Sequence, residues 1–190
     1  VKMICIPITA KNMDSALADI KKANNIADII ELRIDYISSF GLKKLLESAK
    51  KPVIITNRRK IDNGKFEGNE KERLAALKQA IDLGADYIDI EIDADYSEIT
   101  KNRKNSKIII SYHNFKETPE NIDEIFNKLK SANADIVKIA TKANKLSDNL
   151  KIIELVKNIK KPIIAICMGP LGEISRILAP IYGSFLTFAS

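Results

Sequence analysis

The sequence has few of the residues that mark special classes of protein. Its 190 residues include two cysteines, seven glycines and six prolines, too few for a disulfide scaffold or for a collagen-like or low-complexity chain. No apolar run approaches the roughly 18 residues of a membrane-spanning helix. The apolar run Met3–Ile8 is short and is followed by polar residues, which argues against a signal peptide. We therefore expect a globular chain with no membrane partner.

The two cysteines, Cys5 and Cys167, each lie within an apolar, strand-like run. They form no CxxC motif, and the single histidine, His113, adds no ligand spacing typical of zinc. We expect two buried, reduced thiols, which indicates a cytoplasmic protein, and no metal site.

The formal net charge is +6, from 31 basic and 25 acidic residues. Most of the basic residues are lysines, and they are mixed with acidic residues along the chain rather than gathered with arginine and aromatic residues. This pattern favours a solvated, lysine-rich surface over a nucleic-acid footprint. We expect no nucleic-acid partner, and we keep a basic nucleic-acid-binding protein only as a distant alternative.

Short runs rich in isoleucine and valine alternate with amphipathic stretches, a pattern that predicts strands followed by helices. The predicted strands are 3–8, 29–34, 53–57, 87–92, 108–113, 136–141, 163–168 and 185–189. The predicted helices are 14–23, 42–48, 70–83, 96–101, 119–129 with Thr118 as its N-cap, 147–159 and 173–179.

This strict alternation predicts an α/β fold with a parallel sheet, because parallel strands need crossover helices. Eight strands favour a closed (β/α)8 TIM barrel, and no G-x-G-x-x-G motif follows the first strand to support a dinucleotide-binding sheet. Since the sequence ends at Ser190, just after the last strand, we expect one catalytic domain over 1–190 that lacks its last loop and helix and is truncated at its C-terminus.

Polar residues interrupt the C-terminal ends of these strands, where such folds carry their chemistry. Glu31 and Arg33 share one strand face, as do Ser111 and His113, and charged groups belong on the inward face of a barrel. The other polar residues in these positions are Thr56, Arg58, Asp89, Glu91, Asp93 and Lys138. We expect these groups to meet in one central volume, with at least one of the three acidic residues supporting an arginine or lysine.

Lys138 lies between the apolar residues Val137 and Ile139. Lysine is almost never fully buried without a purpose, and a lysine in a dry pocket is more readily neutral and can form a Schiff base with a carbonyl group. A lysine that points out of the strand end is the other interpretation, and this segment alone leaves both open.

His113 ends an apolar strand, which makes it a candidate general acid and base. Only six arginines occur in the chain, and Arg33, Arg58 and Arg176 fall at or just after strand ends. Arginine binds carboxylates through a planar, two-pronged contact, so these residues suggest a small anionic keto-substrate.

Together these segments resemble the type I 3-dehydroquinate dehydratases, the Schiff-base enzymes of the shikimate pathway. The matching motifs run in family order: Glu31-Leu-Arg33-Ile-Asp35, Thr56-Asn-Arg58, Tyr87-Ile-Asp89-Ile-Glu91, Ser111-Tyr-His113, Val137-Lys138-Ile-Ala-Thr141, Met168-Gly169, Ile174-Ser175-Arg176 and Leu186-Thr-Phe188. The resemblance implies a cytoplasmic lyase that dehydrates 3-dehydroquinate to 3-dehydroshikimate in chorismate and aromatic amino-acid biosynthesis. It also implies a homodimer and a reaction without any cofactor.

The resemblance also implies a role for each matching residue. Lys138 would form the imine, His113 would move the protons, and Arg176 would bind the substrate carboxylate. The implied substrate-binding residues are Glu31, Arg33 and Arg58, with Met168 and Phe188 as apolar walls. Asp62 stands where the family usually has a glutamate near its histidine, so it is a possible supporting residue. The family's closing loop with serine and glutamine, and its last helix, have no counterpart before Ser190.

A different class I Schiff-base barrel enzyme, such as a small aldolase acting on a keto-acid or a sugar phosphate, is the nearest alternative. Met168-Gly-Pro-Leu-Gly172 is its only support as a glycine-rich phosphate site, and Arg176 suits a phosphate as well as a carboxylate.

Overall fold

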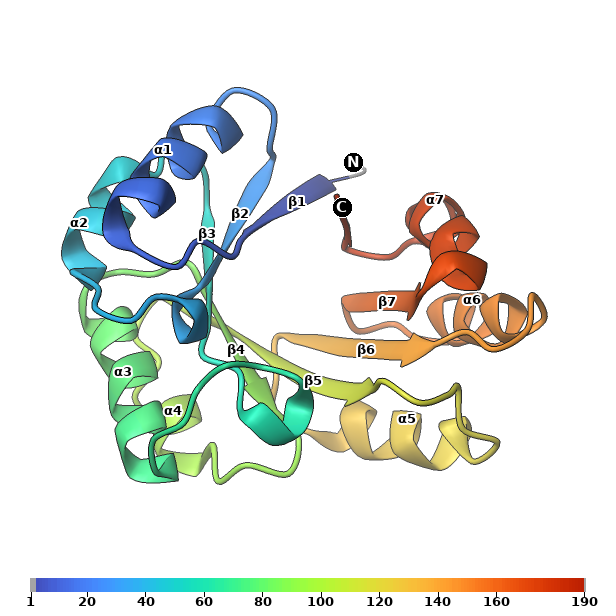
Figure 1. Ribbon diagram of the computed structural model, residues 1–190. Coiled ribbons are helices and arrows are strands. Elements are labelled where there is room, and N and C mark those ends of the chain that lie inside the picture. Colours follow the sequence, from blue (N-terminus) through green and yellow to red (C-terminus); the bar gives the residue numbers. More distant parts are fainter. Residues whose placement is uncertain (1–2, 190) are drawn as a thin grey trace. The chain divides into compact units, whose positions relative to one another are not determined.

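Strands and helices alternate along residues 3–189, which are the residues that the computed structural model describes (Figure 1). The strands are β1 (Met3–Ile8), β2 (Ile29–Arg33), β3 (Val53–Thr56), β4 (Tyr87–Glu91), β5 (Lys107–Asn114), β6 (Ile136–Lys142), β7 (Ile163–Met168) and β8 (Leu186–Phe188). The helices are α1 (Met13–Ala23), α2 (Leu42–Ser48), α3 (Glu70–Asp82), α4 (Ser97–Lys101), α5 (Ile122–Ser131), α6 (Asp148–Lys157) and α7 (Glu173–Tyr182). Short 3-10 helices are η1 (Ile34–Tyr36), η2 (Lys60–Asp62) and η3 (Pro170–Gly172). This order is that of a (β/α)8 fold.

The chain forms two compact units. The N-terminal unit contains Ile4–Ile90, Ala94–Ile108 and Ala189, and the C-terminal unit contains Met3, Glu91–Asp93 and Ile109–Phe188. The prediction of one catalytic domain over 1–190 stays a prediction, and its statement about the end at Ser190 lies outside the described residues.

In the N-terminal unit, β1 to β4 pair in parallel, each with the next. The pairing aligns Glu31 with Ile54, and it places Arg33, Thr56 and Asp89 in one row across β2, β3 and β4. Helices α1 to α3 lie on one side of these strands (Figure 1). Local capping explains where two of them begin: the Asn12 side chain accepts a hydrogen bond from Ser15 N, and Asn69 and Glu72 form a reciprocal capping box.

In the C-terminal unit, β5, β6 and β7 pair in parallel. Ser111, Lys138 and Ile164 form one row across the three strands, and His113 pairs with Ala140 one step further along. The segment leading into β8 is tied to β7, since Phe185 N donates to Ile163 O over 2.6 Å. The end of β8 therefore belongs to the same unit as Lys138.

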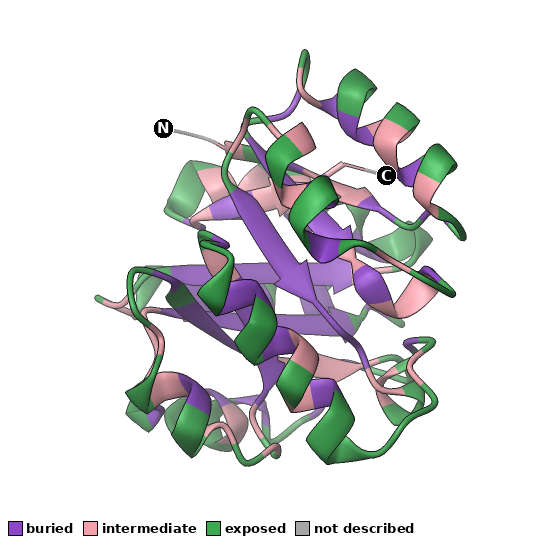
Figure 2. Cartoon of the chain, turned by 90° about the vertical axis from the view of Figure 1, so that its left-hand side faces the viewer, coloured by how far each residue is buried: buried purple, intermediate pink, exposed green. Residues whose placement is uncertain are grey.

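The strands supply half of the buried apolar residues. Figure 2 shows the central strands mostly buried, whereas the helices carry buried, intermediate and exposed residues. On β6, Val137 and Ile139 are fully buried, and together with Thr141 they occupy the face opposite Lys138. Nearly continuous apolar runs such as Ile163–Met168 are typical of parallel strands, which are covered on both faces.

Two predicted helix boundaries are wrong. The helix predicted from Pro119 begins only at Ile122, because Thr118 does not cap it: its Oγ1 is 2.8 Å from Thr141 Oγ1 and donates to Lys142 O over 3.1 Å. The helix predicted to end at Ala179 continues through Pro180 to Tyr182. It stops at Gly183, whose φ of 115° is rare for other residues.

Candidate active site

Lys138 lies on a buried sheet face of the C-terminal unit. Lys138 is 5% exposed and is the third of the seven residues of β6. The prediction that it lies at the end of a strand is therefore wrong, because it lies inside the strand. Residues paired across parallel strands point to the same face, so Ser111 of β5 and Ile164 of β7 flank Lys138, and His113 shares that face. Strand spacing places the Cα atoms of Lys138 and His113 about 8 Å apart, within reach of two long side chains.

Phe188 and Arg176 adjoin this lysine. Lys138 Nζ lies 4.6 Å from the centre of the Phe188 ring, and Arg176 Nη1 donates a hydrogen bond of 2.9 Å to the main-chain oxygen of Phe188. Met168 ends β7 on the same face, in register with Lys142. The structure therefore brings together Lys138, His113, Phe188 and Met168 on one face, with Arg176 bound to the end of β8.

The opposite face of these strands holds a polar cluster that the sequence interpretation did not foresee. Gly172 of η3 lies against Cys167, and Ser175 Oγ accepts a hydrogen bond of 2.7 Å from Cys167 N. Burial is the main cause that raises the pKa of the Cys167 thiol to about 11, even though neighbouring hydroxyl groups act to lower it. Cys5 and Cys167 are both buried and form no disulfide, as predicted. A thiol with a raised pKa, like that of Cys167, is a poor nucleophile.

Glu31 and Arg33 lie on one face of β2 in the N-terminal unit, as predicted. Glu31 is buried and accepts a hydrogen bond of 2.8 Å from Thr56 Oγ1. Asp35 binds Arg33 through two contacts, Nε to Oδ1 at 2.9 Å and Nη2 to Oδ2 at 2.8 Å. Burial acts to lower the pKa of Arg33, but the hydrogen bonds to Asp35 and the charges of Glu31 and Asp35 raise it above its ordinary value.

Arg58, just after β3, forms a buried ion pair with Asp89 of β4. Its Nη2 lies 2.7 Å from Asp89 Oδ1, and both side chains are 5% exposed or less. This contact confirms the expectation that at least one acidic strand-end residue supports an arginine. A buried pair of this kind is costly to break, because the remaining charge stays in a dry site.

We predict that Asp89→Asn lowers the free energy of unfolding by about 3 kcal/mol, because it leaves the buried Arg58 guanidinium without its paired charge. Asp19→Asn is the matched control, since Asp19 pairs with Lys22 on the exposed face of α1, where loss of a pair costs less than about 1 kcal/mol. Urea unfolding of both variants measures the difference. Equal losses would contradict the structural role of the Arg58–Asp89 pair.

Asp62 has a local partner. It ends η2, and its Oδ2 lies 2.6 Å from Arg59 Nε. Asp35 Oδ2 accepts a hydrogen bond of 3.0 Å from Lys65 N, so the segment after η2 is attached to the residue that holds Arg33. The predicted supporting role of Asp62 toward His113 stays a prediction.

Two residues that organise the N-terminal unit had no predicted role. Asp35 appeared only as part of the motif with Glu31 and Arg33. Arg73 of α3 is fully buried, contacts both carboxylate oxygens of Glu70, and donates to Asn57 O at 3.1 Å, just before Arg58. The i,i+3 spacing of Glu70 and Arg73 is a signal that could have found this pair.

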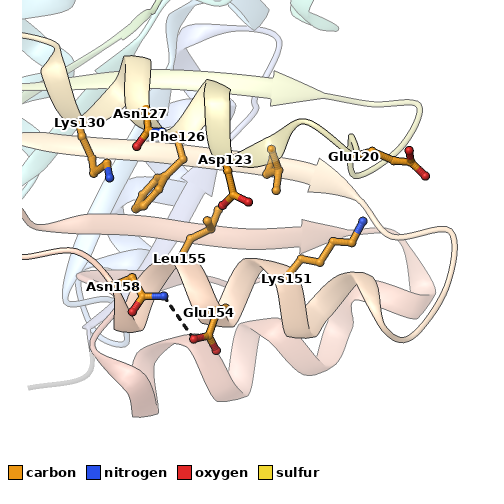
Figure 3. Close-up of a pocket in the computed structure, with 10 residues that line it drawn as sticks. Glu120, Asp123, Phe126, Asn127, Lys130, Lys151, Glu154, Leu155 and Asn158 are labelled. Atoms are coloured by element: carbon orange, nitrogen blue, oxygen red, sulfur yellow. Dashed lines mark hydrogen bonds between the residues drawn. The ribbon is translucent and has the colours of Figure 1, made fainter.

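A separate surface groove of about 450 Å³ lies between α5 and α6 (Figure 3). Its lining combines acidic residues, amides and lysines with the apolar residues Phe126 and Leu155, and Asn158 Nδ2 donates to Glu154 Oε1 over 3.2 Å. None of its lining residues comes from the strand face that carries Lys138. Within residues 3–189, no cluster of three or more histidine, cysteine or acidic residues could hold a metal ion, and no helix is long and apolar enough to cross a membrane.

The βα element order, with a buried lysine of β6 and a histidine of β5 on one face of the sheet, defines an enzyme of the (β/α)8 class. Residues 4–190 match the family model described as type I 3-dehydroquinase, and the chain belongs to this family. This membership decides against the aldolase and nucleic-acid alternatives.

Relatives and solved structures agree with this assignment. The 3-dehydroquinate dehydratases of Methanococcus maripaludis strain C5 and Methanocaldococcus jannaschii are each 40% identical to the chain over 195 residues, which cover 99% of it and 89% and 88% of the relatives. The crystal structure of the type I 3-dehydroquinate dehydratase of Clostridium difficile with covalently modified comenic acid is 28% identical, with a TM-score of 0.89 over 99% of this chain and 84% of that chain. The predicted (β/α)8 TIM-barrel class, the resemblance and the hydro-lyase activity in the shikimate pathway are confirmed.

Proposed function

We propose that this chain dehydrates 3-dehydroquinate to 3-dehydroshikimate through an imine on Lys138. The burial of Lys138 on the sheet face that also carries His113 of the neighbouring strand is the observation that supports this assignment most directly. Lys138 Nζ attacks the ketone carbon at C3 of the substrate as a neutral amine. The ketone oxygen then leaves as water after it takes up protons, and a cationic iminium remains.

The iminium makes the neighbouring C–H bond acidic, because the cationic nitrogen accepts the electron pair when the proton leaves. His113 takes the C2 proton and returns a proton to the departing hydroxyl group, so that the substrate loses one water molecule overall. Hydrolysis of the imine then regenerates Lys138 and releases the product. This sequence consumes no redox equivalent and requires no metal or organic cofactor.

Glu31, Arg33 and Arg58 bind the hydroxyl groups of the substrate in this proposal, and Met168 and Phe188 form apolar walls. This role is supported by the polar partners that orient the three side chains in the absence of substrate. Hydrogen bonds or an ion pair join Glu31 to Thr56, Arg33 to Asp35 and Arg58 to Asp89. Preorganised polar groups lose little orientational freedom when they bind a ligand.

The test is to incubate the protein with 3-dehydroquinate and sodium borohydride and to locate the added mass by peptide mapping. We expect one reduced adduct per chain, on the peptide that contains Lys138. An active enzyme that gives no adduct, or an adduct on another residue, would overturn the assignment of Lys138.

We predict that Arg176→Ala lowers kcat/KM by an amount that corresponds to a rise of about 2–4 kcal/mol in activation free energy. This is the range for loss of one partner of a desolvated charge pair. Nη1 of Arg176 donates to Phe188 O, so the Nε–Nη2 edge faces the carboxylate in our proposal. Arg176→Lys should not restore kcat/KM, because an ammonium group lacks the planar two-pronged geometry. Steady-state kinetics measure both effects, and an unchanged kcat/KM would mean that another group binds the carboxylate.

We also propose that the enzyme is a cytoplasmic homodimer. Two buried thiols that form no disulfide suit a reducing compartment. Exposed apolar side chains on and before α7, namely Leu171, Ile174, Ile177 and Ile181, provide surface that a second copy would cover.

A further inference from the structure

We propose that Arg176 and Phe188 act together as a positioning pair for the reactive nitrogen of Lys138, independently of the contact between Arg176 and the substrate carboxylate. Arg176 fixes the main chain of Phe188, and the Phe188 ring fixes the position of Lys138 Nζ. This inference rests on the proposed function, in which that nitrogen attacks the ketone.

The contact between ring and nitrogen is close and shielded from water. Nζ lies 4.6 Å from the ring centre, inside the range of about 6 Å in which a cation is attracted to an aromatic face. Lys138 is 5% exposed and Phe188 is 9% exposed. Such an attraction is stronger in a desolvated site than at the surface. It restricts the flexible side chain as an ammonium before the nitrogen loses its proton to attack, and again as the cationic iminium.

The position of the ring depends in turn on hydrogen bonds to the main chain at both ends of its segment. At the start of the segment, Phe185 N donates to Ile163 O of β7 over 2.6 Å, and Ser184 Oγ lies within 3.3 Å of both Ile163 O and Ala165 N. At its end, Arg176 Nη1 donates to Phe188 O over 2.9 Å. Arg176 comes from α7, so a single side chain links this helix to the residue that covers Lys138.

This arrangement matters for the reaction because attack on a ketone requires the nitrogen at a defined distance and angle. Small displacements of a nucleophile cost rate even when substrate binding is intact. Loss of the Arg176 hydrogen bond would loosen the end of β8, where Ala189 N still donates to Cys5 O over 2.9 Å, and loss of the ring would release Nζ. Both changes remove the same constraint, so their effects on the rate should overlap rather than multiply.

A double-mutant cycle on kcat tests this with 3-dehydroquinate at saturation, using Arg176→Ala, Phe188→Leu and the double variant. We expect Phe188→Leu to lower kcat about fivefold to tenfold with little change in KM, since loss of one such contact has an effect of this size. The double variant should have nearly the kcat of Arg176→Ala alone. Phe188→Tyr keeps the ring and should recover most of the kcat that Phe188→Leu loses.

A second cycle, which combines Arg176→Ala with Met168→Leu, is the matched control, because Met168 is an apolar wall of another strand. The effects of Arg176→Ala and Met168→Leu on kcat should multiply in the double variant. Thermal unfolding of every variant identifies any that fail to fold, and Phe188→Tyr then supplies the comparison.

Independent effects of Arg176→Ala and Phe188→Leu on kcat would overturn the inference while borohydride still traps the imine on Lys138. Absence of that trapped imine would overturn the proposed function and the inference with it.

Discussion

Lys138→Ala should abolish the borohydride-trapped adduct and lower kcat by several orders of magnitude. Methyl replaces the only group that this mechanism uses to form a covalent bond, and removal of a nucleophile from a concerted set of residues typically has effects of this size. Intact-mass spectrometry after reduction and steady-state kinetics measure the two results.

Lys151→Ala is the control for this experiment. Lys151 is a half-buried lysine of α6 that lines the outer groove (Figure 3), away from the sheet face of Lys138, so its loss should change neither trapping nor kcat. If the Lys138→Ala protein is folded and still gives a reduced adduct at another lysine, the imine has been assigned to the wrong residue.

The second large effect is expected for His113→Ala, which should lower kcat by about 10²–10⁴-fold, the usual contribution of a general acid–base group. Imine formation should be slowed less than its later steps, because proton removal and imine hydrolysis both depend on this side chain. A covalent adduct on Lys138 should therefore accumulate and be visible by mass spectrometry without reduction.

Tyr112→Phe provides the matched control on the same strand. Tyr112 is adjacent to His113 and points to the other face of β5, where its hydroxyl group lies 3.4 Å from Asn114 Nδ2. This variant should have nearly normal kcat. Near-normal turnover in His113→Ala itself would remove His113 from the mechanism.

Most of the fold could be predicted because parallel strands that are covered on both faces have nearly continuous apolar sequences. Met3–Ile8 and Ile163–Met168 were predicted to the residue, and the other strands differ by one or two residues at their ends. The start of α5 could not be predicted from local chemistry. Thr118 followed by Pro119 is a good helix start, but a tertiary hydrogen bond to Thr141 takes up the threonine hydroxyl group.

The candidate site was predictable at the level of residues and faces, because β alternation places Ser111 with His113 and Glu31 with Arg33. Its partners were not predictable from spacing. Asp35 lies two residues from Arg33 and binds it only because η1 turns the chain back, and Asp89 reaches Arg58 only through the register of β3 and β4. Arg73 is the exception, since its i,i+3 spacing from Glu70 on α3 predicts that pair, although not the contact of Arg73 with Asn57 O.

The alternation of side chains along β6 ties catalysis to strand register. Val137 and Ile139 face the helix-covered side, and Lys138 between them faces the other. Because the side-chain period of a strand is two, a slip of β6 by one residue against β5 and β7 would turn Lys138 into the apolar layer and bring a valine or isoleucine to its place. The burial of Val137 and Ile139 therefore stabilises the strand register that the reaction needs. The same free energy that keeps these two side chains buried keeps Lys138 on the face where the substrate binds in our proposal.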